Sequence, residues 1–229
     1  MRTPADGRML MTHACNTAPV ADDWFRSPDW FPDGQSDFEA RLMRARPYNR
    51  AQYMRIKGLA LADAGEARGA RQLWERVLES TEELAASQQA SAMEHLGESY
   101  VQDVPAIAED YFRRLLAEFP TLNGTSHTVE ISLAELLIDK GDRASMEEAL
   151  ALLNSFLERG TSQFPSVHFR LHLALIRIAQ ATGDKETLQR AARTALDLAG
   201  RGPVFPRHKT VGVVHADKAT LKRLRKLAK

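Results

Sequence analysis

Apolar residues recur at helical spacing along most of the chain. Near its end, for example, Leu221, Leu224 and Leu227 would share one face of a helix. Alternation of apolar and polar residues, the mark of a half-buried strand, is nearly absent, and its one candidate is the extended run from Val211 to Val214. The pattern therefore predicts an all-α protein.

Prolines divide the chain into helical windows. None of the ten prolines falls within 48–104, 121–164 or 166–202, and proline costs about 3 kcal/mol inside a helix. Ser36 with Glu39 is typical of a capping box, and Asn49 can cap the next helix. Short connections between helices favour antiparallel hairpins in series. We expect helices over 36–46, 49–65, 67–78 with an extension as far as 86, 87–102, 106–118, 127–140, 145–158, 166–181 and 185–199.

A pattern of small and bulky residues repeats within these windows. Equivalent positions at Gly58, Gly97, Ala134 and Ile176 are 39, 37 and 42 residues apart. The clearest unit has Met93, Leu96, Gly97 and Tyr100 on one helix and Ala108, Phe112 and Pro120 on the next. This unit resembles the tetratricopeptide repeat, with Met93 in place of the usual Trp. The resemblance covers about residues 50–199 and implies a right-handed superhelix of three to four antiparallel hairpins.

The same resemblance implies a function. Tetratricopeptide arrays usually bind a peptide or helix of a partner on the concave face lined by the first helix of each hairpin, so we expect a non-catalytic interaction scaffold. Leu59 and Glu98 stand where the Asn residues of chaperone-tail adaptors are expected, which argues against that class. The predicted groove residues are Gln52, Arg55, Glu94, Glu98, Thr128, Glu135, Asp139 and Arg177. Their acidic middle favours a basic or amphipathic ligand, unless the carboxylates are ordinary solvated surface charges.

Charge is distributed unevenly. The net charge is only +1, and 44% apolar with 27% charged residues excludes disorder along the whole length. Residues 204–229, however, hold eight Lys/Arg and one Asp, whereas the first 203 residues sum to −6. Asp217 can cap a final amphipathic helix, and its polar face carries Lys218, Lys222, Arg223, Arg225 and Lys226.

Three interpretations of this basic tail remain open. Its Leu face can cap the end of the array. Its cations can contact nucleic acid or an anionic membrane. It can fill the acidic groove of its own chain or of a second copy. A nucleic-acid-associated regulator is therefore the alternative to the scaffold, and a homo-oligomer is also open.

Candidate chemistry is sparse. His168 and His172 lie four residues apart, as in helical zinc sites, but no third ligand is evident. His95 has Glu94 and Glu98 as neighbours, which is compatible with an acid–base role, but a position on the helix surface is the favoured interpretation. Cys15 is the single cysteine, so an intrachain disulfide is excluded. We predict no enzyme activity, no metal and no cofactor.

The N-terminal region divides into two parts. Residues 1–20 suggest a flexible leader without a secretion signal, which makes a cytoplasmic location the default, and no apolar run is long enough to span a membrane. Asp-Trp-Phe occurs at Trp24 and again at Trp30, either as an aromatic cap on the array or as a docking motif. The predicted organisation is thus leader 1–20, cap and repeats 21–203, and basic tail 204–229.

Overall fold

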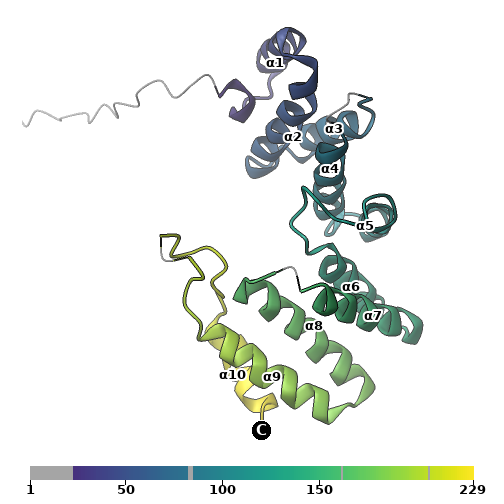
Figure 1. Ribbon diagram of the computed structural model, residues 1–229, viewed down its shortest axis with the longest axis vertical. Helices are drawn as coiled ribbons and strands as arrows, with labels where there is room; N and C mark the ends of the chain where they lie inside the picture. Colours follow the sequence, from purple (N-terminus) through teal and green to yellow (C-terminus); the bar gives the residue numbers. More distant parts are fainter. Residues whose placement is uncertain (1–22, 82–84, 161, 206) are drawn as a thin grey trace, which may run out of the picture.

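The fold was analysed in a computed structural model that describes residues 23–81, 85–160, 162–205 and 207–229 (Figure 1). The predicted leader, including Cys15, lies outside these residues. Within them there are one 3-10 helix and ten α-helices. They are η1 (Trp24–Arg26), α1 (Pro32–Arg44), α2 (Pro47–Asp63), α3 (Ala67–Leu78), α4 (Ala85–Tyr100), α5 (Pro105–Glu118), α6 (Val129–Lys140), α7 (Arg143–Arg159), α8 (Pro165–Thr182), α9 (Lys185–Ala199) and α10 (Lys218–Leu227).

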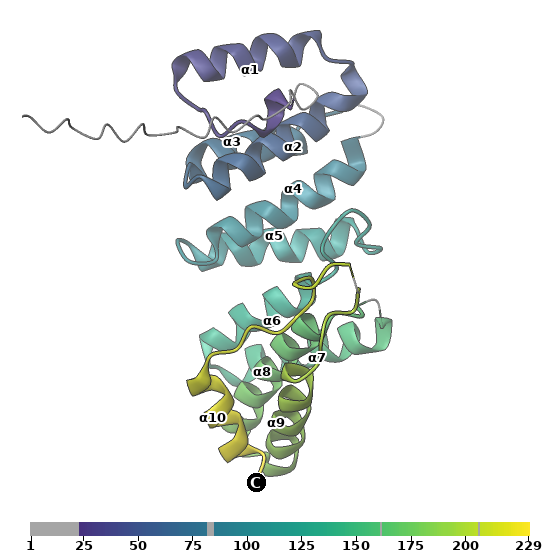
Figure 2. The ribbon, with the colours of Figure 1, turned by 90° about the vertical axis from the view of Figure 1, so that its left-hand side faces the viewer.

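Eight of these helices form four hairpins in chain order. The pairs α2 with α3, α4 with α5, α6 with α7 and α8 with α9 make the most extensive contacts. Figure 2 shows the hairpins stacked along one axis, with α1 at one end and α10 at the other. The predicted all-α class and the hairpins in series are confirmed.

Two predicted N-terminal caps are wrong. The helices α1 and α2 begin at Pro32 and Pro47, so Ser36 and Asn49 lie inside them. Ser36 Oγ donates to the carbonyl of Pro32 at 2.9 Å rather than capping an N-terminus. Proline fits the first helical position because the N–H it lacks would have no partner there.

The structure also tests three other local predictions. Helix α3 ends at Leu78 and does not extend to 86, and the run from Val211 to Val214 contains no strand. The cap predicted at Asp217 is confirmed, since its Oδ1 accepts a hydrogen bond from the Thr220 backbone N–H at 2.6 Å.

Glycine lets the helices of the first two hairpins cross closely. A Cβ added to Gly58 would lie 2.3 Å from Nε1 of Trp74, and one added to Gly97 would lie 2.4 Å from Cε1 of Phe112. Both aromatic rings are fully buried. Only a residue without a side chain fits at either position, which is why the repeat pattern has glycine there.

The aromatic segment before α1 packs onto the first hairpin. The Trp24 ring contacts Phe38 and Tyr53 at centroid distances of 5.3 and 5.2 Å, and Trp30 packs over Gly69. This placement agrees with the capping interpretation of the two tryptophans.

Lys57 of α2 anchors the aromatic segment that precedes α1. Its side chain is 2% exposed, and its Nζ donates to the carbonyls of Ser27 at 2.6 Å and Asp29 at 2.8 Å. The ammonium also lies 5.5 Å from the ring centroid of Trp30. Lys57 occupies a position where the repeat pattern expects Leu, and these contacts show what the lysine does there.

Candidate functional site

An open cavity is lined by the first helices of three consecutive hairpins. We call it the three-helix face, and it encloses about 380 Å³. Its lining comes from α4 and the turn after it, from α6 and from α8. The residues are Glu98, Val101, Gln102, Ser132, Glu135, Leu136, Asp139, Arg170 and Arg177. The structure thus brings together four of the eight predicted groove residues: Glu98, Glu135, Asp139 and Arg177.

Two ion pairs between α6 and α8 form part of this face. Arg170 donates to Glu135 through Nε at 2.8 Å and through its terminal nitrogen at 2.5 Å. The same guanidinium reaches Ser132 Oγ at 3.1 Å. Arg177 pairs with Asp139 one further turn along α6. Two of the four predicted acidic groups are therefore neutralised by arginines of the next hairpin.

Glu98 is the carboxylate that keeps the face acidic. Its side chain is half exposed, and its neighbour is the imidazole of His95, whose Nδ1 lies 3.9 Å from the carboxylate. The His95 ring also packs against Trp74 at 5.3 Å. An exposed carboxylate next to an imidazole, beside the apolar Val101, can receive a cationic group of a partner.

Glu94 does not line the face. Its side chain is 4% exposed, and its carboxylate accepts hydrogen bonds from the backbone N–H of Ser126 at 2.9 Å and from the Ser126 hydroxyl at 2.6 Å. Burial raises the pKa of Glu94, although the bonds from Ser126 partly oppose that shift. The residue anchors the connection between α5 and α6, so a ligand cannot reach it.

The other predicted groove residues lie outside this cavity. Gln52 is exposed on α2, and Arg55 donates from Nε to Oε1 of Gln88 at 2.7 Å, joining α2 to α4. Thr128 lies just before α6, where its hydroxyl and that of Ser126 are 2.7 Å apart. Arg55 therefore takes part in a contact between consecutive hairpins, whereas Thr128 makes its contact within the connection between α5 and α6.

The repeat geometry also places Val101, Gln102 and Arg170 in the groove, so two lining residues were not predicted. Ser132 and Leu136 lie on α6 beside Glu135 and Asp139. Positions 132, 135, 136 and 139 follow the spacing of one helix face, so this signal was present in the sequence.

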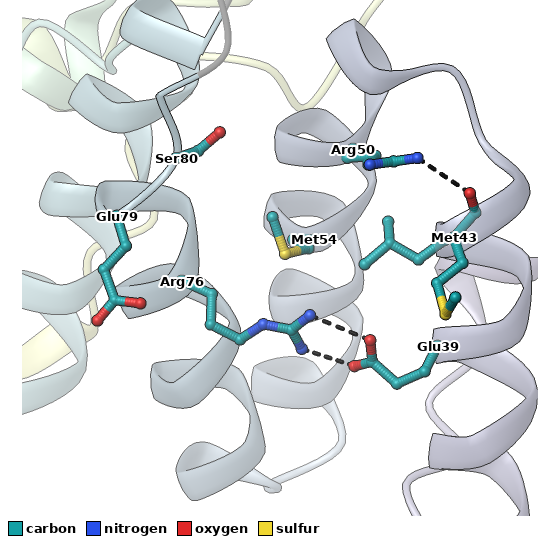
Figure 3. Close-up of a pocket in the computed structure, with 8 residues that line it drawn as sticks. Glu39, Met43, Arg50, Met54, Arg76, Glu79 and Ser80 are labelled. Carbon is teal, nitrogen blue, oxygen red and sulfur yellow. Dashed lines mark hydrogen bonds and ion pairs between the residues drawn. The ribbon is translucent and has the colours of Figure 1, made fainter.

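A second pocket lies between α1, α2 and α3, as Figure 3 shows. Arg76 donates to both carboxylate oxygens of Glu39 at 2.6 and 3.0 Å, and Arg50 donates to the carbonyl of Met43 at 2.9 Å. The Met43 side chain is 76% exposed. These polar contacts hold α1 against the first hairpin, so we assign the pocket a structural role.

The two histidines of α8 have separate surroundings. His168 Nε2 lies 2.9 Å from the Ser162 carbonyl, and its ring packs on Phe156. Burial, with a smaller effect of His168, lowers the pKa of His172 to about 4. Among the residues that the structure describes, no group of three or more His, Cys, Asp or Glu is placed to hold a metal ion.

The comparisons with known proteins return no relative. No protein-family model matches the chain, and neither a curated protein nor a solved structure matches it. Over the described residues, every helix is too short or too polar to cross a membrane. The class of protein is thus defined by the fold alone: over the described residues it is an all-helical array of sequential hairpins.

Proposed function

We propose that this chain is a non-catalytic interaction scaffold of the tetratricopeptide-repeat type, which holds a peptide or helix of a partner protein on the three-helix face. The single observation that carries the proposal is that α4, α6 and α8, each the first helix of its hairpin, line one cavity. A right-handed superhelix remains part of this proposal.

The chemistry of the face narrows the partner. Because Glu135 and Asp139 are paired with arginines, Glu98 is the carboxylate best placed to bind a cation. Val101, which is partly exposed, adds apolar surface beside it. An amphipathic segment with a Lys or Arg next to an apolar side chain complements this arrangement.

The test is a screen of peptide arrays rich in such segments, probed with the full chain. Glu98→Lys should abolish binding of the selected peptides, because it places a cation against a cation. Glu158→Lys makes the same charge change on the exposed surface of α7, outside the cavity, and should leave binding unchanged.

Melting temperatures of all three proteins show whether the variants stay folded. If peptides bind wild type and both variants equally well, the three-helix face is not the binding site. Selection of acidic rather than basic peptides would contradict the assigned chemistry.

A further inference from the structure

Helix α10 is a fixed layer at the end of the array. Leu224 is 1% exposed and belongs to the same core cluster as Ala195 and Leu198 of α9. Nε of Arg193 donates to the Ala228 carbonyl at 3.1 Å. The apolar side of α10 thus packs on α9, next to which the helix lies in Figure 1, and this placement agrees with the cap interpretation of the tail.

The opposite side of α10 is a row of cations, which we call the basic end face. Lys218 and Lys226 lie about 12 Å apart along the helix at 1.5 Å per residue. Arg223 sits at the edge of the row and donates to Oε1 of Gln180 at 2.7 Å. Besides Arg223, which is exposed as well, the exposed cations are Lys218, Lys222, Arg225 and Lys226 on the helix and Lys229 just after it.

These five cations have no carboxylate partner within the described part of the chain. The nearest acidic residues in the sequence are otherwise engaged, since Asp217 caps α10 and Asp197 binds Arg201. The opposite end of the array differs: α1 carries both signs of charge, and its Asp37 binds Arg41. A polar end face is enough to keep an array soluble, so a face of one sign calls for a further explanation.

The geometry points to a phosphate backbone. We propose that the basic end face is a sequence-independent contact for double-stranded nucleic acid. A membrane fits less well, because the Leu face that would insert is buried on α9 and α10 shows no large exposed apolar side chain. Single strands fit less well, because no aromatic residue in α10 offers a stacking surface. Several Lys and Arg side chains on one face of a docked helix can neutralise phosphates of a duplex backbone.

The experiment is fluorescence anisotropy of a labelled DNA duplex titrated with the full chain at several salt concentrations. For about four phosphate contacts, the slope of log K against log salt should lie between about −3 and about −4. Lys222→Gln combined with Lys226→Gln should bring the slope to about −2 and weaken binding at least about tenfold at low salt.

A matched control removes the same charge from the other end of the array. Arg44→Gln with Arg68→Gln alters two exposed cations of α1 and α3, and should keep the wild-type slope. An equal loss in the control would overturn the proposal, because net charge alone would then explain binding. So would the absence of duplex binding, or binding to phosphatidylserine-containing vesicles in its place.

This inference does not rest on the proposed scaffold function. Glu98→Lys tests the three-helix face and leaves the basic end face intact. Failure of one proposal therefore leaves the other standing.

Discussion

The first three hairpins and the fourth fill equivalent positions with side chains in reversed order of size. In the first hairpin Gly58 faces Trp74, and in the second Gly97 faces Phe112. In the third hairpin the equivalent positions hold Ala134 and Leu153, and in the fourth they hold Ile176 and Ala192.

All of these side chains are buried. The series therefore runs from a glycine with a large ring, through an alanine with a leucine, to an isoleucine with an alanine. The two equivalent positions of each hairpin together fill the space between its helices, and either helix can supply the larger side chain.

Ile176→Ala is the largest expected effect and tests the reversed arrangement directly. The partner Ala192 has no bulk with which to fill the space, so a cavity should persist and lower the free energy of unfolding by about 2–5 kcal/mol. Urea denaturation measures the change. Ile107→Ala, at a side chain that is 39% exposed, is the matched control and should cost under about 1 kcal/mol. Equal losses would mean that Ile176 does not carry the bulk of its hairpin.

Gly97→Ala is expected to cost about 1–3 kcal/mol, because the new Cβ meets the Phe112 ring. Adding Phe112→Leu recreates the Ala and Leu combination of the third hairpin. The double variant should therefore be more stable than the sum of the two single changes predicts, as measured by a double-mutant cycle in urea.

Gly202→Ala serves as the control, since a Cβ there meets no atom within 4 Å. It should change stability by less than about 0.5 kcal/mol. Strict additivity in the cycle would contradict the idea that the two positions exchange volume.

The smallest effect concerns pH and the last hairpin. His172 has an ordinary pKa of 6.5 and a folded-state pKa of about 4, lowered first by burial and then by His168. The unfolded chain therefore binds more protons between these values, so stability is full above pH 6.5 and falls as the pH drops toward 4.

Since the side chain is only partly buried, we expect His172 to account for a loss of about 1 kcal/mol. His172→Gln should remove that part of the loss in thermal melts recorded across this range. His215→Gln, at an exposed side chain, is the control and should keep the wild-type profile. An unchanged profile in His172→Gln would show that another group causes the loss.

Much of the fold was predictable because its signals are local. Proline-free windows located the helices, and the small positions at Gly58 and Gly97 marked the crossings of two hairpins. The errors at Ser36 and Asn49 arose because two kinds of start signal competed, and proline at the first position prevailed over a polar cap.

The candidate site was predictable only in part. Helical spacing placed Glu98, Glu135 and Asp139 on the first helices of their hairpins, where the structure has them. It gave no indication that Glu94 would be buried beneath Ser126, a residue 32 positions away. Which carboxylates remain free for a partner depends on contacts between hairpins, and these have no signature in the spacing of one helix.

The sequence alone determined that this chain forms helical hairpins in series with a basic amphipathic helix at the end. These properties follow from the periodicity and capping of neighbouring residues. The tertiary structure decided that Arg170 and Arg177 pair with the carboxylates of Glu135 and Asp139 on α6. It also decided that the Leu face of α10 packs on α9. The reason is physical: ion pairs and docking across 30 to 40 residues depend on how each hairpin is rotated against the next, and that rotation is set by how side-chain volumes fit in the stack.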